Sequence, residues 1–527
     1  GCIEGTDGVW DGAVPYVMAN PMAAPNVFAP RMRAVRLLGE EGMQKVVAAQ
    51  EPGGSGDIYE GLNEDQKQAL KEATSMGFPP KAWFDYPYMG DGALMVLVPA
   101  VYQMFPTYFK DFWKKEGYEG ADPESNEARA HMKLVTTVEH LDYDYAEPEL
   151  SEEEKNTVDT SWLNTILGGE KLPHIYLKDA IPADTYTYHC RFKVLDGACA
   201  GKEINISSID GNMLELHPEN DGKHENPFKE LKPGDQVMID NGDAIAMQCF
   251  HRHQLPDETY DVYDQFRNED GSPKYTQLPM LVAPMTAISG AGLMPTGNIH
   301  GKVIGICSMM DESACPWHGD WYRKAIGRCG IDEQDHFRLY YHDNSIHDDR
   351  AGYLDDPQNQ VDYLGTLHQA LLDVAAWCEK GIEPFDTMNY TYADGQITLP
   401  KGAKERGGMQ PVVSAVVENA AGQSDYDGKV TRAKVGENIC FKAVIEVPPK
   451  AGKVTHAAWD YEKTNDWSND EVIEAVDDTT YKIEADHVFT KPGIYYPVIK
   501  VASNRHGDAG DIFTQCKNLD RVKVIVE

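Results

Sequence analysis

Two short, uninterrupted apolar runs in the middle of the chain are each followed by polar residues. Residues 301–310 (GKVIGICSMM) lead into Asp311, and residues 337–341 (FRLYY) lead into residues 342–347 (HDNSIH). Such runs lack the polar alternation of a half-exposed strand, and burial on both faces is typical of parallel sheets. A third run, residues 9–16 (VWDGAVPY), predicts another buried strand of the same sheet.

Helical patterns with apolar residues three and four apart separate these runs. One helix has a clear start and stop, because Asn63 is a suitable N-cap and Gly77 follows the last turn. Another is strongly amphipathic and ends at Gly381. The expected helices cover residues 31–50, 63–76, 317–328 and 361–380. Strands and helices in alternation predict an α/β domain with a parallel sheet.

Two regions show alternating strands and turn signals instead of helices. Residues 165–275 predict a small β-barrel or β-sandwich inserted into the α/β domain, and residues 408–527 predict an all-β region. Strands are expected near residues 411–418, 438–447, 453–460, 481–489, 493–502 and 520–526. The predicted domains are residues 1–164 (α/β part with a helical, aromatic lid), 165–275 (inserted β-rich domain), 276–405 (second α/β part) and 406–527 (β-sandwich).

Composition narrows the classes of function. With 48 basic and 85 acidic residues among 527, the net charge is −37, which argues against nucleic acid and anionic membranes as partners. No apolar run approaches the roughly 20 residues that span a bilayer. The first residues show no signal peptide, although a mature secreted chain would already have lost one.

The cysteines suggest no metal or redox motif. There are ten, and no CxxC occurs, which excludes zinc ribbons and thioredoxin-type motifs. They can be small buried hydrophobic residues. Their spacing also permits disulfides without establishing any, for example Cys190–Cys199, Cys315–Cys329 and Cys440–Cys516.

Asp311 and His347 are the candidate catalytic residues. Each follows a predicted buried strand, and functional residues of open α/β sheets gather beyond the carboxyl ends of strands. An acid after one strand and a histidine after the next match the chain order of α/β-hydrolases, in which the acid orients the histidine and the histidine acts as general base. Glu312 and Asp320 compete for the acid, and His342 and His336 for the base.

The nucleophile of such an enzyme has no obvious place in the chain. No G-x-S-x-G occurs, and Ser289, which is flanked by glycine, lies too close before Asp311 for the usual order. Either the serine precedes residue 1, or the chain is not a complete serine hydrolase.

Two histidines at 251 and 253 form a second candidate site. On a strand His251 and His253 would point to one face, which suits a metal ion completed by nearby aspartates. A loop in which Arg252 pairs with an acid, or a substrate pocket, explains the same residues. We expect no metal or cofactor and assign both histidines to substrate binding. The aspartates are Asp257, Asp261 and Asp264.

Aromatic residues are concentrated at positions 78–118. They predict either core and lid packing or an apolar wall for a bulky substrate. Under the second interpretation we assign Trp83, together with Trp317, to the substrate site.

Several segments resemble those of secreted bacterial α/β-hydrolases with an inserted β-domain, which are distantly similar to tannases and feruloyl esterases. The resemblance rests on residues 11–16 (DGAVPY), 76–80 (MGFPP), 251–254 (HRHQ), 264–266 (DQF), 316–323 (PWHGDWYR) and 410–413 (QPVV). It implies an ester hydrolase whose serine and first strands precede Gly1, in a processed precursor. The N-terminal piece would then be held noncovalently or by a disulfide, for which Cys2 is suited.

The C-terminal region resembles a PKD domain. Residues 459–461 (WDY), 487–489 (HVF) and 491–495 (KPGIY) carry this resemblance, with Trp459 expected in the core and Gly493 at a turn. PKD-like domains imply an adhesion or spacer role outside the cell. The acidic loop at 466–478 fits either calcium binding or a solvated face.

Together these observations predict a secreted or envelope-located esterase acting on a bulky, phenolic ester. The alternatives are a noncatalytic protein that binds a polymer or cell surface, and a metal-dependent hydrolase using His251 and His253. The expected partners are the ester substrate and the N-terminal fragment.

Overall fold

The structure is a computed structural model that describes most of the chain. The described residues are 1–20, 22–87, 89, 92–95, 97–144, 171–183, 185–187, 189–216, 226–348, 358–468 and 470–527. The predicted domain boundary at residues 164–165 lies outside them. The chain forms two compact units, one of Gly1–Gly90, Pro256–Arg267 and Ala283–Glu527, the other of Asp91–Leu255 and Asn268–Val282.

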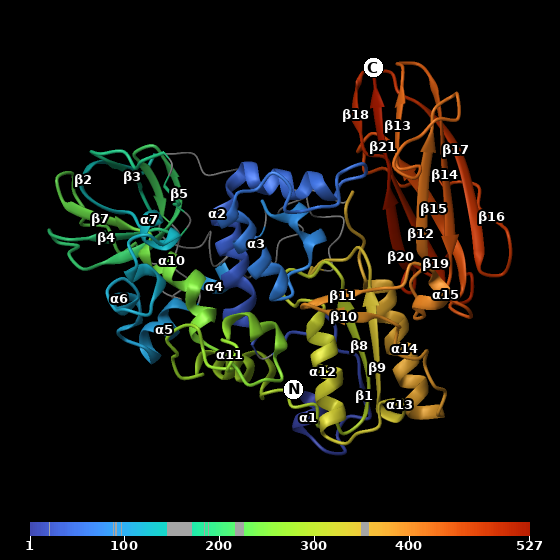
Figure 1. The fold of residues 1–527 in the computed structure, drawn as a ribbon, viewed down its shortest axis with the longest axis horizontal. Coiled ribbons are helices and arrows are strands. Elements are labelled where there is room, and N and C mark those ends of the chain that lie inside the picture. The colour runs from blue at the N-terminus through green and yellow to red at the C-terminus, as the bar shows by residue number, and fades with distance from the viewer. Residues whose placement is uncertain are drawn as a thin grey trace. The chain divides into compact units, whose positions relative to one another are not determined.

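The first unit contains a parallel sheet of three strands in the order β1-β8-β9. These are β1 (Gly12–Ala13), β8 (Lys302–Ser308) and β9 (Phe337–His342). Every residue of β9 is buried, and so are six of the seven in β8. The strands lie between helices α12 (Trp317–Arg328) and α14 (Leu364–Lys380) (Figure 1). Two-sided burial by helices is the physical reason for the uninterrupted apolar runs.

The strand predicted at residues 9–16 is shorter and more exposed than expected. β1 has two half-buried residues, extended by a bridge between Tyr16 and Ile306, and Tyr16 is 45% exposed. The prediction of full burial was therefore wrong here, because β1 is an edge strand with β8 on one side only.

Helices complete the first unit. In α3 (Glu64–Ser75), Asn63 accepts a hydrogen bond from the Gln66 amide, and the Gln66 side chain reciprocates, so the predicted N-cap is confirmed. Helix α2 (Ala23–Gln50) begins earlier than predicted and is interrupted at Gly39, whose φ is 60°. Shorter elements are α1 (Cys2–Gly5), η1 (Pro80–Asp85), η4 (Asp261–Phe266), α11 (Val282–Ala291), α13 (Glu333–His336), α15 (Ala403–Arg406), β10 (Thr391–Ala393) and β11 (Gln396–Thr398).

The second unit holds a closed barrel of six antiparallel strands in the order β2-β3-β6-β5-β4-β7. They are β2 (Lys133–Asp142), β3 (His174–Leu177), β4 (Arg191–Val194), β5 (Glu203–Asp210), β6 (Met213–Leu216) and β7 (Gln236–Asp240). The barrel thus includes β2, which precedes the boundary expected at residue 165. After β7 the chain is helical, not β-rich, with α10 (Gly242–Cys249) and η3 (Phe250–His253). The helices before the barrel in this unit are α4 (Gly92–Met95), α5 (Val98–Met104), α6 (Tyr108–Phe112), η2 (Glu119–Ala121) and α7 (Asn126–Ala130).

The C-terminal region of the first unit forms three β-sheets around one core that includes Trp459 and Phe441. Its strands run from orange to red in Figure 1. The sheets are β12-β14-β17-β16 (Val412–Glu418, Asn438–Glu446, Thr480–Val488, Glu474–Ala475), β13-β21-β18 (Val430–Ala433, Lys523–Val526, Gly493–Tyr495) and β15-β19-β20 (Lys453–Asp460, Val498–Asn504, Cys516–Arg521).

The C-terminal strands differ from the prediction in detail. The strand expected at 493–502 is split into β18 and β19 around Pro497, which cannot donate a ladder hydrogen bond. Gly493 begins β18 and is not among the residues with positive φ, so it does not make the expected turn.

The fold is therefore mixed α/β, with a small parallel sheet, a six-stranded antiparallel barrel and C-terminal β-sheets. All ten cysteines are free, so none of the three permitted disulfides is present. Among the described residues, no helix is both long and apolar enough to cross a membrane.

Candidate functional site

Asp311 and His347 meet beyond the carboxyl ends of β8 and β9. The imidazole Nδ1 of His347 lies 3.0 Å from one carboxylate oxygen of Asp311 and 3.2 Å from the other. The parallel pairing of β8 with β9, which places Ser308 beside His342, brings these two loops to the same edge of the sheet. The pair that the sequence order predicted is formed.

The Asp311 carboxylate is fixed by main-chain donors. The amides of Ser313 and Ala314 donate to the same oxygen at 2.9 and 2.6 Å, and Asp311 is 0% exposed. Because a buried carboxylate is costly without partners, these bonds offset the cost of burying it and aim it at His347.

His347 has one nitrogen engaged and the other available. Nδ1 faces Asp311, Nε2 has no hydrogen-bond partner among the described residues, and the side chain is 43% exposed. Burial would lower the pKa of His347, but the hydrogen bond and charge of Asp311, with smaller effects of Glu312 and Asp348, raise it to about 9. Asp311 thus orients the ring and stabilises its protonated form.

The two competing acids have other roles. Glu312 accepts a hydrogen bond from the main-chain N–H of His347 at 3.4 Å, so it contacts the loop and not the imidazole ring. Burial, followed by the neighbouring aspartate, raises the pKa of Glu312. Asp320 accepts a hydrogen bond from the Tyr390 hydroxyl at 2.7 Å and forms an ion pair with Lys324 at 2.7 Å.

The two competing bases are also engaged elsewhere. His342 is buried, with Nδ1 3.2 Å from the Gln410 amide, and burial lowers its pKa to about 4. His336 Nδ1 faces the carbonyl of Gly301 at 3.3 Å. Neither contacts Asp311.

No serine in the described part of the chain makes a hydrogen bond to His347. Ser289 is exposed on α11 and has no hydrogen bond to either member of the pair. The structure thus brings Asp311 and His347 into contact, and no described serine joins them.

The outer edge of β1 pairs with no described strand. Large apolar side chains are exposed beside it: Val9 is 63%, Trp10 is 50% and Tyr16 is 45% exposed. An edge strand presents unpaired amide and carbonyl groups, so this edge can accept another strand.

A cavity of about 640 Å³ adjoins this strand, lined by residues 13–20 and by one face of α12. Two lining side chains are buried and have polar atoms without hydrogen-bond partners among the described residues, namely Asn20 (Nδ2) and Trp321 (Nε1), and the buried His318 lies beside the main chain of Met18. Burial lowers the pKa of His318 to about 3, which keeps the ring neutral. Buried polar groups at an open cavity find their partners in water or in another segment that enters the cavity.

The cavity residues were missed as site candidates. His318 and Trp321 lie in the segment PWHGDWYR, and a spacing of three places them on one face of a helix. That spacing was the sequence signal that could have identified His318 and Trp321. No sequence pattern pointed to Asn20.

His251 and His253 lie in the 3₁₀-helix η3, so the strand geometry required for a shared metal face was wrong. Both are 0% exposed. His253 Nδ1 faces the Thr276 carbonyl at 2.7 Å and Nε2 faces Glu119 at 3.1 Å, while Arg252 donates to Glu119 at 2.8 Å. Burial would raise the pKa of Glu119, but the hydrogen bond of His253 and the charge of Arg252 lower it to about 2.

This cluster is therefore a buried ion-pair network, which agrees with the alternative in which Arg252 pairs with an acid. No group of three metal-binding side chains occurs in the part of the chain that the structure describes.

Trp83 and Trp317 occupy the core and not an open surface. Trp83 is 0% exposed and packs against Phe78, with ring centroids 4.1 Å apart and the ring planes tilted by 35°. Trp317 is 3% exposed and donates to the Met76 carbonyl at 2.9 Å. A Cβ on Gly77 would lie 2.0 Å from the Trp317 ring, so this glycine permits the contact.

Comparison with known proteins adds little. No model of a known protein family matches the chain, and no curated protein matches it. One matching solved structure is a crystal structure of an engineered protein, 12% identical over 43% of this chain and 41% of that chain, with a TM-score of 0.14. A similarity that weak carries no argument about fold or function.

Proposed function

We propose that the protein is a serine-type carboxylic ester hydrolase in which Asp311 and His347 are two members of the catalytic triad. The observation that supports this most directly is the Asp311–His347 contact of 3.0 Å at the ends of adjacent parallel strands, with the second ring nitrogen unpartnered. A histidine held by a buried acid on one side and open on the other is the arrangement required of a general base.

In this proposal the serine comes from a segment outside residues 1–527 whose strand adds to the open edge of β1. The support is the unpaired edge, the exposed apolar side chains beside it and the adjoining cavity with its orphaned polar atoms. A strand there would be next to β1, and its carboxyl end would lie at the same edge of the sheet as Asp311 and His347.

The chemistry would follow from the two described residues. Neutral His347 takes the serine proton through Nε2 as the oxygen attacks the ester carbonyl, and Asp311 stabilises the resulting imidazolium. Main-chain amides of the serine turn stabilise the oxyanion. His347 then protonates the leaving alcohol, and water repeats the steps to release the acid.

The surrounding regions fit a secreted or envelope enzyme in this proposal. The C-terminal sheets would form a PKD-like sandwich: Trp459 lies in its core, and His487 stacks on Tyr461 with centroids 4.2 Å apart. The substrate would be a bulky ester, phenolic as the resemblance to tannases implies. The four side chains first assigned to substrate binding are buried, so they lend no support to that detail.

The experiment is fluorophosphonate labelling of the protein isolated from its natural source, followed by intact mass and peptide mapping. We expect a labelled serine on a co-purifying fragment or on an extension of this chain. Asp311→Asn should suppress labelling, and Asp335→Asn, which changes an exposed acid away from the pair, should not. Label on Ser289 would contradict the proposed source of the nucleophile.

A noncatalytic binding protein is the second candidate. It is favoured by the lack of a hydrogen bond between His347 and any described serine. Absence of label in a preparation shown to contain every covalently or noncovalently attached segment would establish this alternative over hydrolysis.

A further inference from the structure

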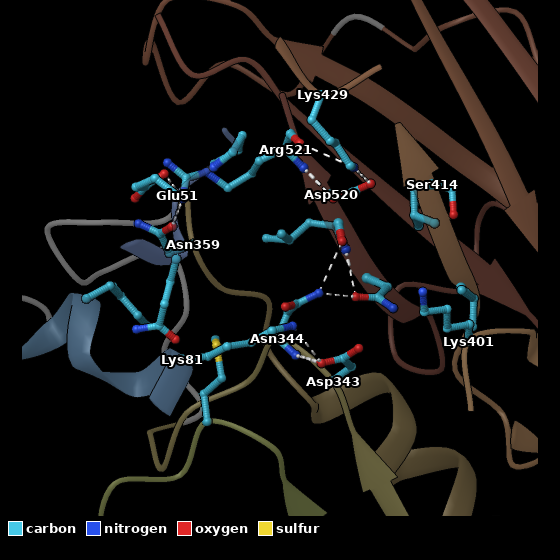
Figure 2. A pocket seen from close by; sticks show the side chains of 18 of the residues that line it. Glu51, Lys81, Asp343, Asn344, Asn359, Lys401, Ser414, Lys429, Asp520 and Arg521 are labelled. Atoms are coloured by element: carbon cyan, nitrogen blue, oxygen red, sulfur yellow. Dashed lines mark hydrogen bonds and ion pairs between the residues drawn. The ribbon is translucent and has the colours of Figure 1, made fainter. Parts of the chain in front are cut away.

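A second cavity of the first unit, of about 440 Å³, lies between the C-terminal sheets and the polar ends of the parallel strands. Its lining includes Lys81 of η1, Asn344 after β9, and Arg521 at the end of β20 (Figure 2). Met310 also lines it and immediately precedes Asp311. The cavity therefore adjoins the loops that carry the candidate catalytic pair without containing the pair.

The charge of this cavity opposes that of the protein. The chain carries −37 overall, yet five cationic side chains and only three carboxylates line the cavity, an excess of two positive charges. The cationic side chains are Lys81, Lys401, Arg406, Lys429 and Arg521.

The three carboxylates are already neutralised within the cavity wall. Asp343 lies 3.3 Å from the Arg406 guanidinium. Asp520 lies 2.5 Å from the Lys429 ammonium, and Glu51 lies 2.9 Å from Arg521. Each acid thus has its own cation.

Two lysines account for the excess of positive charge. Lys401 is exposed and has no ion pair or hydrogen bond with the described residues. Lys81 is only loosely held, 3.7 Å from Asp343, and its side chain is 63% exposed. In addition, Nε of Arg521 is buried and has no hydrogen-bond partner among the described residues. Figure 2 shows Lys81 and Lys401 reaching the cavity from separate segments.

We infer that this cavity binds an organic anion carrying two or more carboxylates. Two lysines from separate segments can each meet one negative group, and the cavity is large enough for a small organic molecule. Apolar side chains, including Phe84, Met310 and Val412, supply contact for the carbon skeleton of the ligand. This inference is independent of ester hydrolysis.

Binding has a structural consequence. The wall combines η1 and the loop after β9 with β12 and β20 of the C-terminal sheets, so a bound dianion links these parts of the first unit. A ligand that binds only the folded state raises its stability by mass action.

The test is isothermal titration calorimetry of the full chain with malonate and citrate at low ionic strength, with sulfate in a parallel arm. We expect saturable binding with a dissociation constant of about 1 mM or tighter. Lys401→Gln should weaken it about threefold to tenfold, as expected for loss of one exposed charge contact, and Lys81→Gln combined with Lys401→Gln should weaken it further.

Lys404→Gln is the matched control, because Lys404 is an exposed lysine three residues away that does not line the cavity. Its binding should equal that of the unchanged protein, and the thermal midpoint without ligand should be the same in both variants. Preference for malonate and citrate over sulfate supports a carboxylate ligand. Sulfate binding as tightly as the carboxylates would overturn the assignment of that ligand class. No saturable binding, or equal weakening by the Lys401 and Lys404 variants, would overturn the site.

Discussion

Two histidine–carboxylate pairs in this molecule have nearly the same contact distance and opposite accessibility. His347 lies 3.0 Å from Asp311, and His253 lies 3.1 Å from Glu119. Both ring nitrogens of His253 are engaged and the side chain is 0% exposed. His347 engages one nitrogen only and its side chain is 43% exposed.

The difference shows that a short contact between a histidine and an acid does not identify a catalytic pair. Glu119 contacts Arg252 and His253 inside the protein, so both of its carboxylate oxygens are engaged in the core. Asp311 accepts hydrogen bonds from main-chain amides and faces one histidine, whose far nitrogen contacts no described residue. We therefore expect changes at the first pair to alter rates and changes at the second to alter stability.

The largest expected effect is loss of activity in Asp311→Asn. If the protein hydrolyses esters as proposed, the turnover rate should fall about 10³- to 10⁴-fold, because the amide cannot stabilise the imidazolium and favours the wrong tautomer. The measurement is initial rates on a chromogenic ester with the native, complete protein. Asp335→Asn should retain full activity, and an equal loss in both variants would show that the effect of Asp311→Asn does not depend on its contact with His347.

The pH dependence sharpens the same comparison. His347 must be neutral to act as base, and its pKa is about 9, so kcat/KM should rise about tenfold per pH unit from pH 7 and level off near pH 9. Because the pKa of His347 is raised in the folded state, its protonated form also stabilises the fold. This contribution is complete below about pH 6.5 and is lost as the pH rises towards 9. A pH-rate profile that is flat from pH 6 to 10 would argue against His347 as base.

Glu119→Gln should mainly destabilise the protein. Removing one partner of a buried network leaves Arg252 without its carboxylate, which costs about 3 kcal/mol of unfolding free energy. Denaturant unfolding of the variant measures it, with Glu116→Gln, an exposed neighbour, as control. Activity per folded molecule should be unchanged.

The lowered pKa of Glu119 predicts a matching acid response. Its contribution to stability is complete above about pH 4.5 and declines as the pH falls towards 2. Between these values the unchanged protein should lose more stability than the Glu119→Gln variant does. Parallel loss in the two proteins would mean that Glu119 carries no net ion-pair stabilisation.

The smallest effect is expected for Trp317→Phe. The variant loses the hydrogen bond to the Met76 carbonyl, so its free energy of unfolding should fall by about 1–2 kcal/mol. Because Trp317 is buried, KM should not change. A rise in KM without a change in unfolding would restore Trp317 as a substrate-binding residue.

The sequence predicted the strands and helices whose signals are local. The runs that became β8 and β9 are buried on both faces, and Asn63 and Gly381 mark helix ends by backbone chemistry that short segments reveal. Chain order together with the strands before each residue also paired Asp311 with His347, because parallel neighbours bring their carboxyl ends together.

The remaining features depend on contacts distant in sequence. His251 and His253 were expected on a strand, but their conformation is set by Glu119 and Thr276, which no local pattern connects to them. The partial exposure of β1 follows from its edge position, which depends on which strands the sheet contains. Aromatic side chains such as Trp83 look alike in a core and in a pocket until packing is known.

The open edge of β1 also determines how this chain should behave in a test tube. Its unpaired backbone and the exposed Val9, Trp10 and Tyr16 form a surface on which copies can stack, and the net charge of −37 keeps copies apart at low salt. At about 1 M salt the screening length shrinks to about 3 Å, so that this repulsion vanishes. The isolated chain should therefore be most soluble in dilute buffer and precipitate as sodium chloride is added.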